Sequence, residues 1–170
     1  EMFAFGGQDM PFANTALGEG TNWQDSVFQS APVESYNLSI SGGTGNTRYS
    51  LGATYFSQEG IVGGSTSNFS RYNTRLNLST DLSSKLTLNS VFLFSSDNRS
   101  SLAENGIGSV LYNTINAFPN KPIRTLDGNY SYLDEVADII NPIAQMENSY
   151  NYSIADKFVG KEELVYKFNE

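Results

Sequence analysis

The strongest constraint on the fold is a repeated alternation of polar and apolar side chains. From 71 to 82, the odd positions are all polar and the even positions are Tyr, Thr or Leu. Successive side chains of a strand point to opposite faces, so a period of two predicts a strand with one polar and one apolar face. The same pattern recurs along the chain. It predicts five strands, at 33–41, 47–57, 70–81, 85–96 and 157–168.

The alternation also predicts which side chains share a face. Arg71, Asn73, Arg75 and Asn77 are expected on the polar face. The expected apolar face carries Tyr49, Leu51, Tyr55, Tyr72, Leu76, Leu78, Leu86, Leu88, Phe92 and Phe94. Glu162 is an exception. It occupies an even position, as Phe158 and Leu164 do, so its carboxylate is expected on the apolar face of the last strand.

The connections between these strands alternate between short and long. Residues 42–46 and 82–84 form short connections, whereas 58–70 and 96–150 form long ones. Transmembrane β-barrels alternate in this way, with short periplasmic turns and long extracellular loops. Four of the strands have about 10–12 residues, close to the roughly 9–11 that cross a bilayer and longer than the ~5–6 usual in soluble sheets.

The second long connection has structure of its own. Ile107, Val110, Leu111 and Ile115 recur at helical spacing and predict a helix within 104–117. A second helical turn is expected within 133–140, ending before Pro142. Asp127-Gly128-Asn129 predicts a tight turn rather than a calcium site, since the other oxygen ligands are missing.

Composition excludes several kinds of chemistry. The chain has no Cys and no His, which rules out disulfides, thiolate or imidazole metal sites and a Ser-His-Asp triad. A net charge of -8 argues against nucleic acid as a partner. Asp134, Glu135 and Asp138 include the two carboxylates that a glycosidase requires, but we interpret them as solvated charges of the loop. We therefore expect no catalytic, metal or cofactor residues.

Several strings resemble the SusC/RagA family of TonB-dependent outer-membrane nutrient transporters. The first is Gly-Thr-Asn-Trp-Gln-Asp-Ser-Val-Phe at 20–28, followed by Ala31-Pro32. The others follow in family order, at 36–43, 55–62, 69–78 and 141–144. The resemblance covers most of 20–168.

This resemblance implies an excised segment of a large transmembrane β-barrel in the bacterial outer membrane. The fold would be an all-β antiparallel meander with a long, partly helical extracellular loop. The parent would import oligosaccharides or peptides, with a SusD-like lipoprotein lid and TonB as partners, and would not be an enzyme. The expected division is 1–32 as a plug-to-barrel or loop segment, 33–95 as four strands, 96–156 as the long loop and 157–170 as the fifth strand.

Two sets of residues are candidates for function. Arg71, Asn73, Arg75 and Asn77 either line a ligand path or are solvated lumen residues paired with neighbouring acids. Trp23, Asp25 and Tyr112 are candidates for contact with loop, lid or substrate, and for Trp23 and Asp25 the alternative is a packing anchor. The isolated segment is expected to self-associate. A rival interpretation is a soluble β-sandwich that binds carbohydrate.

Overall fold

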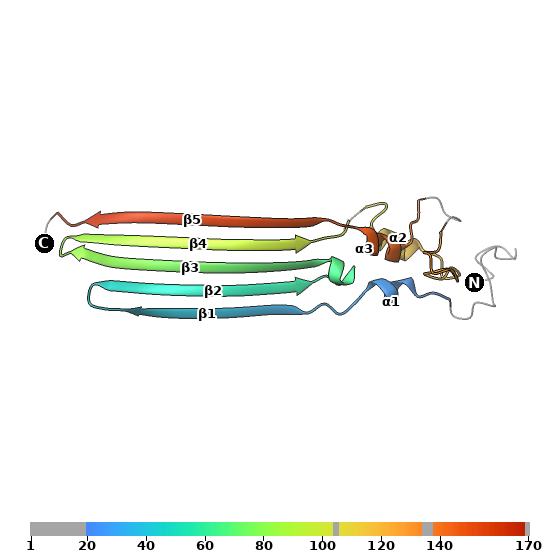
Figure 1. Ribbon diagram of the computed structural model, residues 1–170, viewed down its shortest axis with the longest axis horizontal. Coiled ribbons are helices and arrows are strands. Elements are labelled where there is room, and N and C mark those ends of the chain that lie inside the picture. Colours follow the sequence, from blue (N-terminus) through green and yellow to red (C-terminus); the bar gives the residue numbers. More distant parts are fainter. Residues whose placement is uncertain (1–19, 104–105, 134–137, 169–170) are drawn as a thin grey trace, which may run out of the picture. The chain divides into compact units, whose positions relative to one another are not determined.

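The computed structural model describes residues 20–103, 106–133 and 138–168. Five antiparallel strands form one sheet in the order β1-β2-β3-β4-β5, each paired with its neighbours in sequence (Figure 1). The predicted antiparallel meander is therefore confirmed. The strands are β1 (Val33–Gly43), β2 (Thr47–Glu59), β3 (Asn68–Ser83), β4 (Leu86–Ser100) and β5 (Tyr152–Tyr166).

Most of the strands are longer than the alternation predicts. β4 continues to Ser100 rather than 96, and β5 begins at Tyr152 rather than 157. The extra residues pair with a neighbouring strand, as Ser100 does with both Asn68 and Tyr152. In β4 the added residues 97–100 are all polar and give no hydropathy alternation, so sequence patterning ends that strand too early. The added residues of β5 do alternate, with Tyr152 and Ile154 on the apolar face, so that part of the strand was missed although the pattern is present. β5 also ends at Tyr166, short of the predicted 168.

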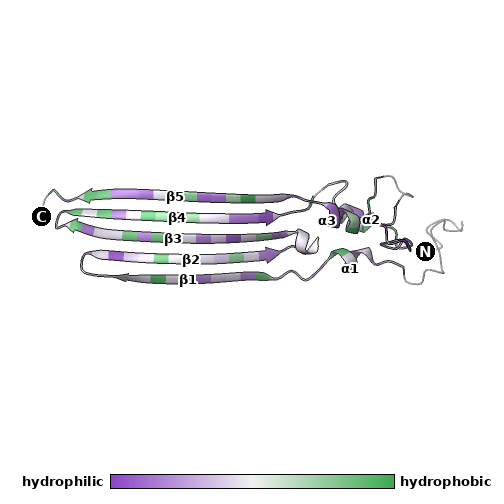
Figure 2. Cartoon of the chain, viewed as in Figure 1, coloured by the Kyte–Doolittle hydropathy of each residue, from purple (hydrophilic) through white to green (hydrophobic). Residues whose placement is uncertain are grey.

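The predicted faces are confirmed by the register. Leu76 lies between Leu51 of β2 and Phe92 of β4 in one cross-strand row, so all three share a face. Tyr55 and Tyr72 are opposite one another, with ring centroids 4.7 Å apart. Figure 2 shows the resulting change between hydrophilic and hydrophobic colours along the strands.

The sheet has no buried apolar core among its described residues. Leu38, Phe158 and Leu164 on the apolar face are each 65–68% exposed. Ser90 is the one residue of the five strands in the buried class. An exposed apolar surface of this kind is typical of a site of contact with lipid or with another protein.

A second compact unit has its own core. We call it the loop unit; its described residues are 20–30, 60–66 and 101–150, less the gaps at 104–105 and 134–137. It holds α1 (Trp23–Val27), a 3₁₀ turn η3 (Gly64–Thr66), α2 (Val110–Asn116) and α3 (Pro142–Asn148). Its buried apolar side chains form two clusters, one of Trp23, Leu133 and Ile139, the other of Val27, Leu102 and Val110. None of the helices in the described ranges is long and apolar enough to cross a membrane.

The helices differ from those predicted at several points. α2 is shorter than 104–117, and it begins after Ser109, whose side chain accepts a hydrogen bond from the Tyr112 N–H. The helical turn expected within 133–140 is wrong where it is described: Ile139 and Ile140 are not helical and Asp138 has a φ of 71°. Residues 134–137 of that prediction lie outside the described residues.

A helix instead begins at Pro142, where the prediction ended one. Proline suits the first helical position, because its missing N–H would have no partner there and its φ already matches a helix. Asn141 precedes it and caps the helix through its side chain. α1 was not predicted at all, although Asn22 with Asp25 three residues later is an N-cap signature.

Candidate functional site

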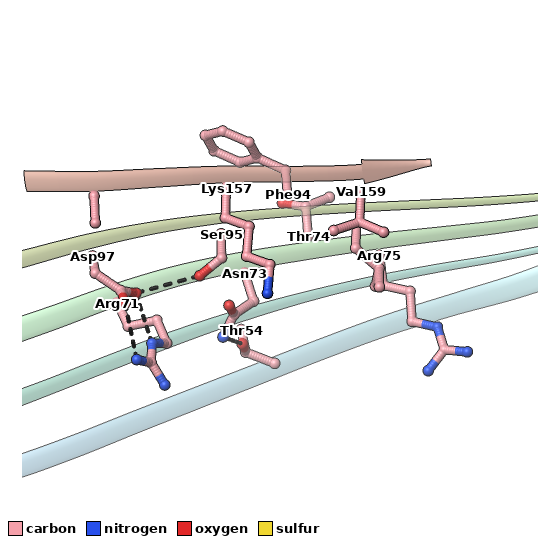
Figure 3. Close-up of a pocket in the computed structure, with 12 residues that line it drawn as sticks. Thr54, Arg71, Asn73, Thr74, Arg75, Phe94, Ser95, Asp97, Lys157 and Val159 are labelled. Carbon is pink, nitrogen blue, oxygen red and sulfur yellow. Dashed lines mark hydrogen bonds and ion pairs between the residues drawn. The ribbon is translucent and has the colours of Figure 1, made fainter. Parts of the chain in front are cut away.

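A hollow of about 700 Å³ opens on the polar face of the sheet, over β2, β3, β4 and β5 (Figure 3). In Figure 3 Lys157 projects to one side of the sheet together with Arg71 and Asn73, whereas Phe94 projects to the other. The alternation of β3 and the register of its neighbours bring these polar side chains together. The polar side chains in the lining are Thr54, Arg71, Asn73, Arg75, Ser95, Asp97 and Lys157.

Arg71 is neutralised by a carboxylate on the adjacent strand. Its Nε donates to Asp97 Oδ1 at 2.7 Å and its Nη2 donates to Asp97 Oδ2 at 2.9 Å, because the two residues are direct cross-strand partners. Ser95 also donates to this carboxylate, and the guanidinium carbon lies 5.1 Å from the centre of the Phe69 ring. This two-pronged contact fixes the guanidinium plane against β4.

The other predicted polar-face residues are arranged differently. Asn73 donates from Nδ2 to Thr54 Oγ1 at 3.1 Å, and Arg75 donates from Nε to Asn77 Oδ1 at 3.2 Å. Arg75 makes no ion pair within the described residues. The expected pairing with a neighbouring acid therefore holds for Arg71 and is wrong for Arg75.

Lys157 was missed as a site residue. The register places it in the same cross-strand row as Asn73 and Ser95, on the polar face, and it makes no ion pair within the described ranges. The alternation of the last strand could have placed Lys157 on the polar face, since 157 is an odd position and the even positions carry Phe158 and Leu164.

Glu162 lies on the apolar face, as its parity predicted. It is the cross-strand partner of Ser90, whose hydroxyl donates to the Glu162 carboxylate at 2.5 Å. Ser90 is only 4% exposed. The register of the last strand is thereby confirmed, and a carboxylate lies among apolar neighbours with one hydroxyl as its partner.

In the loop unit, hydrogen bonds join the segment 20–23 to the segment 118–121. Trp23 donates from Nε1 to the carbonyl of Phe118 at 2.8 Å, and Thr21 donates from its N–H to the carbonyl of Pro119 at 2.7 Å. Gly20 has a φ of +75°, and a Cβ there would lie 2.5 Å from the Pro119 carbonyl oxygen. Only glycine fits this backbone approach.

The candidates for lid contact differ in accessibility. Trp23 is 3% exposed and Tyr112 packs against the same cluster, so both contribute to the interior of the loop unit. Asp25 is exposed, and its carboxylate accepts a hydrogen bond from Asn22 at 2.7 Å. Contact with a lid stays a prediction for these residues, and Asp25 is the one whose side chain is open to a partner.

Asn141 joins three segments of the loop unit. Its Oδ1 accepts from the N–H groups of Ile143 and Ala144, which caps α3. Its Nδ2 donates to the carbonyls of Ile123 and Ser131 at 2.9 and 3.2 Å. Asn141 is 5% exposed, so these bonds satisfy a buried amide.

Arg124 and Tyr130, which flank the predicted turn at 127–129, both contact Glu147 of α3. The turn forms as expected: the Thr125 N–H donates to the Asn129 carbonyl at 2.8 Å. Arg124 donates to Glu147 at 3.0 Å and lies 4.1 Å from the Tyr130 ring centre. The Tyr130 hydroxyl donates to the same carboxylate, which raises the pKa of Tyr130 above its usual value near 10.

The described residues contain no group of three or more His, Cys, Asp or Glu that could hold a metal ion. Asp134 and Glu135, two of the three acidic residues considered for glycosidase chemistry, lie outside the described residues. What the described geometry offers is a hollow on the polar sheet face, lined by cations together with Leu93, Ala155 and Val159, and an exposed apolar surface on the other face. This combination is typical of a segment of β-barrel wall.

Comparison with known proteins finds similarity to TonB-dependent receptors. The chain is 34% identical over its whole length to TonB-dependent receptor P26 of Formosa agariphila. It is 28% identical over 87% of its length to receptor P3 of the same organism, and 27% identical over 88% to TonB-dependent receptor SusC of Bacteroides thetaiotaomicron. The search against family models found no match.

Solved structures agree with this assignment. The RagAB peptide importer in its closed-closed state matches 67% of the chain at 25% identity, with a TM-score of 0.54. Another structure of the RagAB peptide transporter matches the fold over 89% of the chain, with a TM-score of 0.63 at 20% identity. The resemblance to the SusC/RagA family of TonB-dependent receptors is confirmed.

The chain spans only a small part of these relatives. It covers 17% of receptor P26 and of SusC, 15% of receptor P3, and 13% and 18% of the two RagAB structures.

Proposed function

We propose that the chain forms part of the wall of an outer-membrane importer that draws energy from TonB to take up oligosaccharides or peptides. The observation that carries this proposal is the two-faced, single-layered sheet, which is apolar and uncovered on one side and polar on the other. The similarity to TonB-dependent receptors over the full length of the chain supports it. In this function the sheet contributes structure and a ligand-facing surface, with no catalysis.

The two faces have different roles in this proposal. The apolar face meets lipid, and the Tyr36–Tyr55–Tyr72 row, with ring centroids 6.2 and 4.7 Å apart, belongs to an aromatic girdle at one membrane interface. The polar face, with Arg71, Asn73, Arg75 and Asn77, borders the lumen. The loop unit lies on the extracellular side, where a SusD-like lipoprotein lid would contact it.

The rival, a soluble carbohydrate-binding sandwich, requires a second sheet packed on the apolar face. The described residues form a single sheet whose apolar side chains are exposed. This observation favours the barrel wall.

Deletion of the gene that encodes the full protein tests the proposed function. The deletion strain and its parent are grown on single oligosaccharides and on peptides as the sole carbon source. We expect growth to be lost on one substrate class and restored by the gene, but not by a version that lacks the TonB-contacting segment. Equal growth on all substrates, with no change in uptake of labelled oligosaccharide or peptide, contradicts the proposal.

A further inference from the structure

Charge is distributed unequally between the two faces of the sheet. Every Arg and Lys of the five strands lies on the polar face. The acidic residues of the strands are divided, since Asp81, Asp97 and Glu163 lie on the polar face and Glu34, Glu59, Asp156 and Glu162 on the apolar face. The polar face is therefore net positive, although the chain as a whole carries -8.

These cations are also ordered along the sheet. Successive cross-strand rows of the polar face each contain one basic side chain, contributed in turn by different strands. Rows on one face are two residues apart, which is about 7 Å along the strands. We call this series the basic ladder; in order, its members are Arg99, Arg71, Lys157, Arg75, Lys161 and Arg48.

The middle of the basic ladder is not neutralised within the sheet. The row of Arg71 contains Asp97, which binds it, and the row of Arg48 contains Glu163. The rows of Lys157, Arg75 and Lys161 contain no carboxylate. Lys161 reaches Glu163 at 3.3 Å, but both side chains are at least half exposed, where such a pair is weak.

The hollow extends from the Arg71–Asp97 pair over the rows of Lys157 and Arg75. Arg75 and Lys157 both line it, Lys157 beside Asn73, Thr54 and Ser95, and Arg75 in a row with Leu93 and Val159 (Figure 3). The amide and hydroxyl groups of these neighbours both donate and accept hydrogen bonds, as sugar hydroxyls require. Cations that recur in successive rows, on different strands and among groups of this kind, match an oligomer that carries repeated negative charges.

We propose that the basic ladder guides an anionic oligosaccharide, one that bears carboxylate or sulfate groups, along the inner wall of the transporter. This inference rests on the proposed function and narrows its cargo. Rows of Arg and Lys select anions in pores, and several sites of similar strength let a charged group pass from one to the next without a single deep trap. Arg75 and Lys157 are the specificity-determining residues of the hollow.

Binding to the purified full-length transporter in detergent tests this proposal. The probes are a dextran sulfate oligosaccharide, uncharged dextran of the same length and hexaglutamate, measured by calorimetry at low and high salt. We expect dextran sulfate to bind at least about tenfold more tightly than either other probe, with the preference reduced by salt. Equal binding of dextran and dextran sulfate overturns the proposal, and tighter binding of hexaglutamate overturns the choice of an oligosaccharide.

Two double variants test whether dextran sulfate binds at the hollow. Arg75→Gln with Lys157→Gln removes two charges from the hollow, and we expect at least about tenfold weaker binding of dextran sulfate, since hydrogen bonds between charged groups are the strong ones. Lys85→Gln with Lys167→Gln removes the same charge outside the five strands, and the affinity should not change. Lys157→Gln alone serves if the double variant fails to assemble.

The same variants distinguish cargo from an acidic segment of the transporter itself. If Arg75→Gln with Lys157→Gln leaves dextran sulfate binding unchanged but lowers the melting temperature of the probe-free transporter, the ladder holds protein and the proposal is overturned. Because binding is measured without uptake, this failure leaves the proposed import function standing. The import function is instead contradicted if deletion of the gene alters neither growth nor uptake.

Discussion

Ser90 Oγ donates a 2.5 Å hydrogen bond to the carboxylate of Glu162, and both side chains lie on the apolar face of the sheet. A carboxylate that faces lipid lowers the stability of a barrel, by an amount that depends on its depth. The hydroxyl of Ser90 offsets part of that cost. A residue placed in this way is open to a stabilising substitution.

Replacing Glu162 by Leu should therefore stabilise the full-length transporter in lipid vesicles by about 1 kcal/mol. The free energy of unfolding is measured by urea titration. Glu163→Leu is the matched control: Glu163 is the next residue, on the polar face, where it pairs with Lys161, so its loss should give no gain. A stabilisation by Glu163→Leu that equals or exceeds that by Glu162→Leu would contradict the assignment of faces.

Spin labels at adjacent positions should report opposite environments. Leu76→Cys places a label on the apolar face and Arg75→Cys places one on the polar face. The chain has no native cysteine, so each label is unique within it. In vesicles the label at 76 should be relaxed by oxygen, which concentrates in lipid, and the label at 75 by a water-soluble nickel complex. The reverse result would rule out the lipid and lumen assignment.

Asn141→Ala should destabilise the loop unit by about 2–3 kcal/mol, because it removes a helix cap and leaves the carbonyls of Ile123 and Ser131 without a partner. Hydrogen exchange of 121–148 in the full-length protein measures the change. Asn148→Ala is the control, since Asn148 is exposed and, among the residues that the structure describes, its side chain bonds only the Ala144 carbonyl one turn earlier. Similar exchange in the two variants would show that Asn141 does not brace the unit.

Trp23 should act through packing and one hydrogen bond. Trp23→Phe keeps most of the ring but loses the Nε1 bond to Phe118, with an expected cost of about 1 kcal/mol, whereas Trp23→Ala should cost about 3–5 kcal/mol through the cavity it leaves. Protease sensitivity of the 101–150 connection reports both. If Trp23→Ala leaves proteolysis unchanged but weakens binding of a lid protein, Trp23 has a contact role rather than a packing one.

The isolated 170-residue chain should self-associate in buffer without detergent. Its sheet exposes an apolar face, and within the described residues β1 and β5 each pair on one side only, which leaves open edges. Sedimentation velocity at several concentrations measures the size. A monodisperse 18.7 kDa monomer at high concentration would contradict this expectation.

Much of the candidate site followed from local pattern. Odd or even position in a strand was enough to assign Arg71, Asn73, Arg75 and Asn77 to one face and Glu162 to the other, because side chains alternate in any strand. The alternation within one strand does not predict which residues of neighbouring strands lie side by side. Pairing of Arg71 with Asp97, and the absence of such a partner for Arg75, depend on the register between β3 and β4.

The sequence by itself determined the period-two strands, their two faces and the order of short and long connections, because these depend on neighbours a few residues apart. Only the tertiary structure decided the register, and with it the order of cations in the basic ladder, since five strands contribute to each cross-strand row. The same holds for the core of the loop unit, where Trp23 bonds Phe118 and Asn141 bonds Ile123. Such contacts join residues far apart in the chain, which no local periodicity encodes.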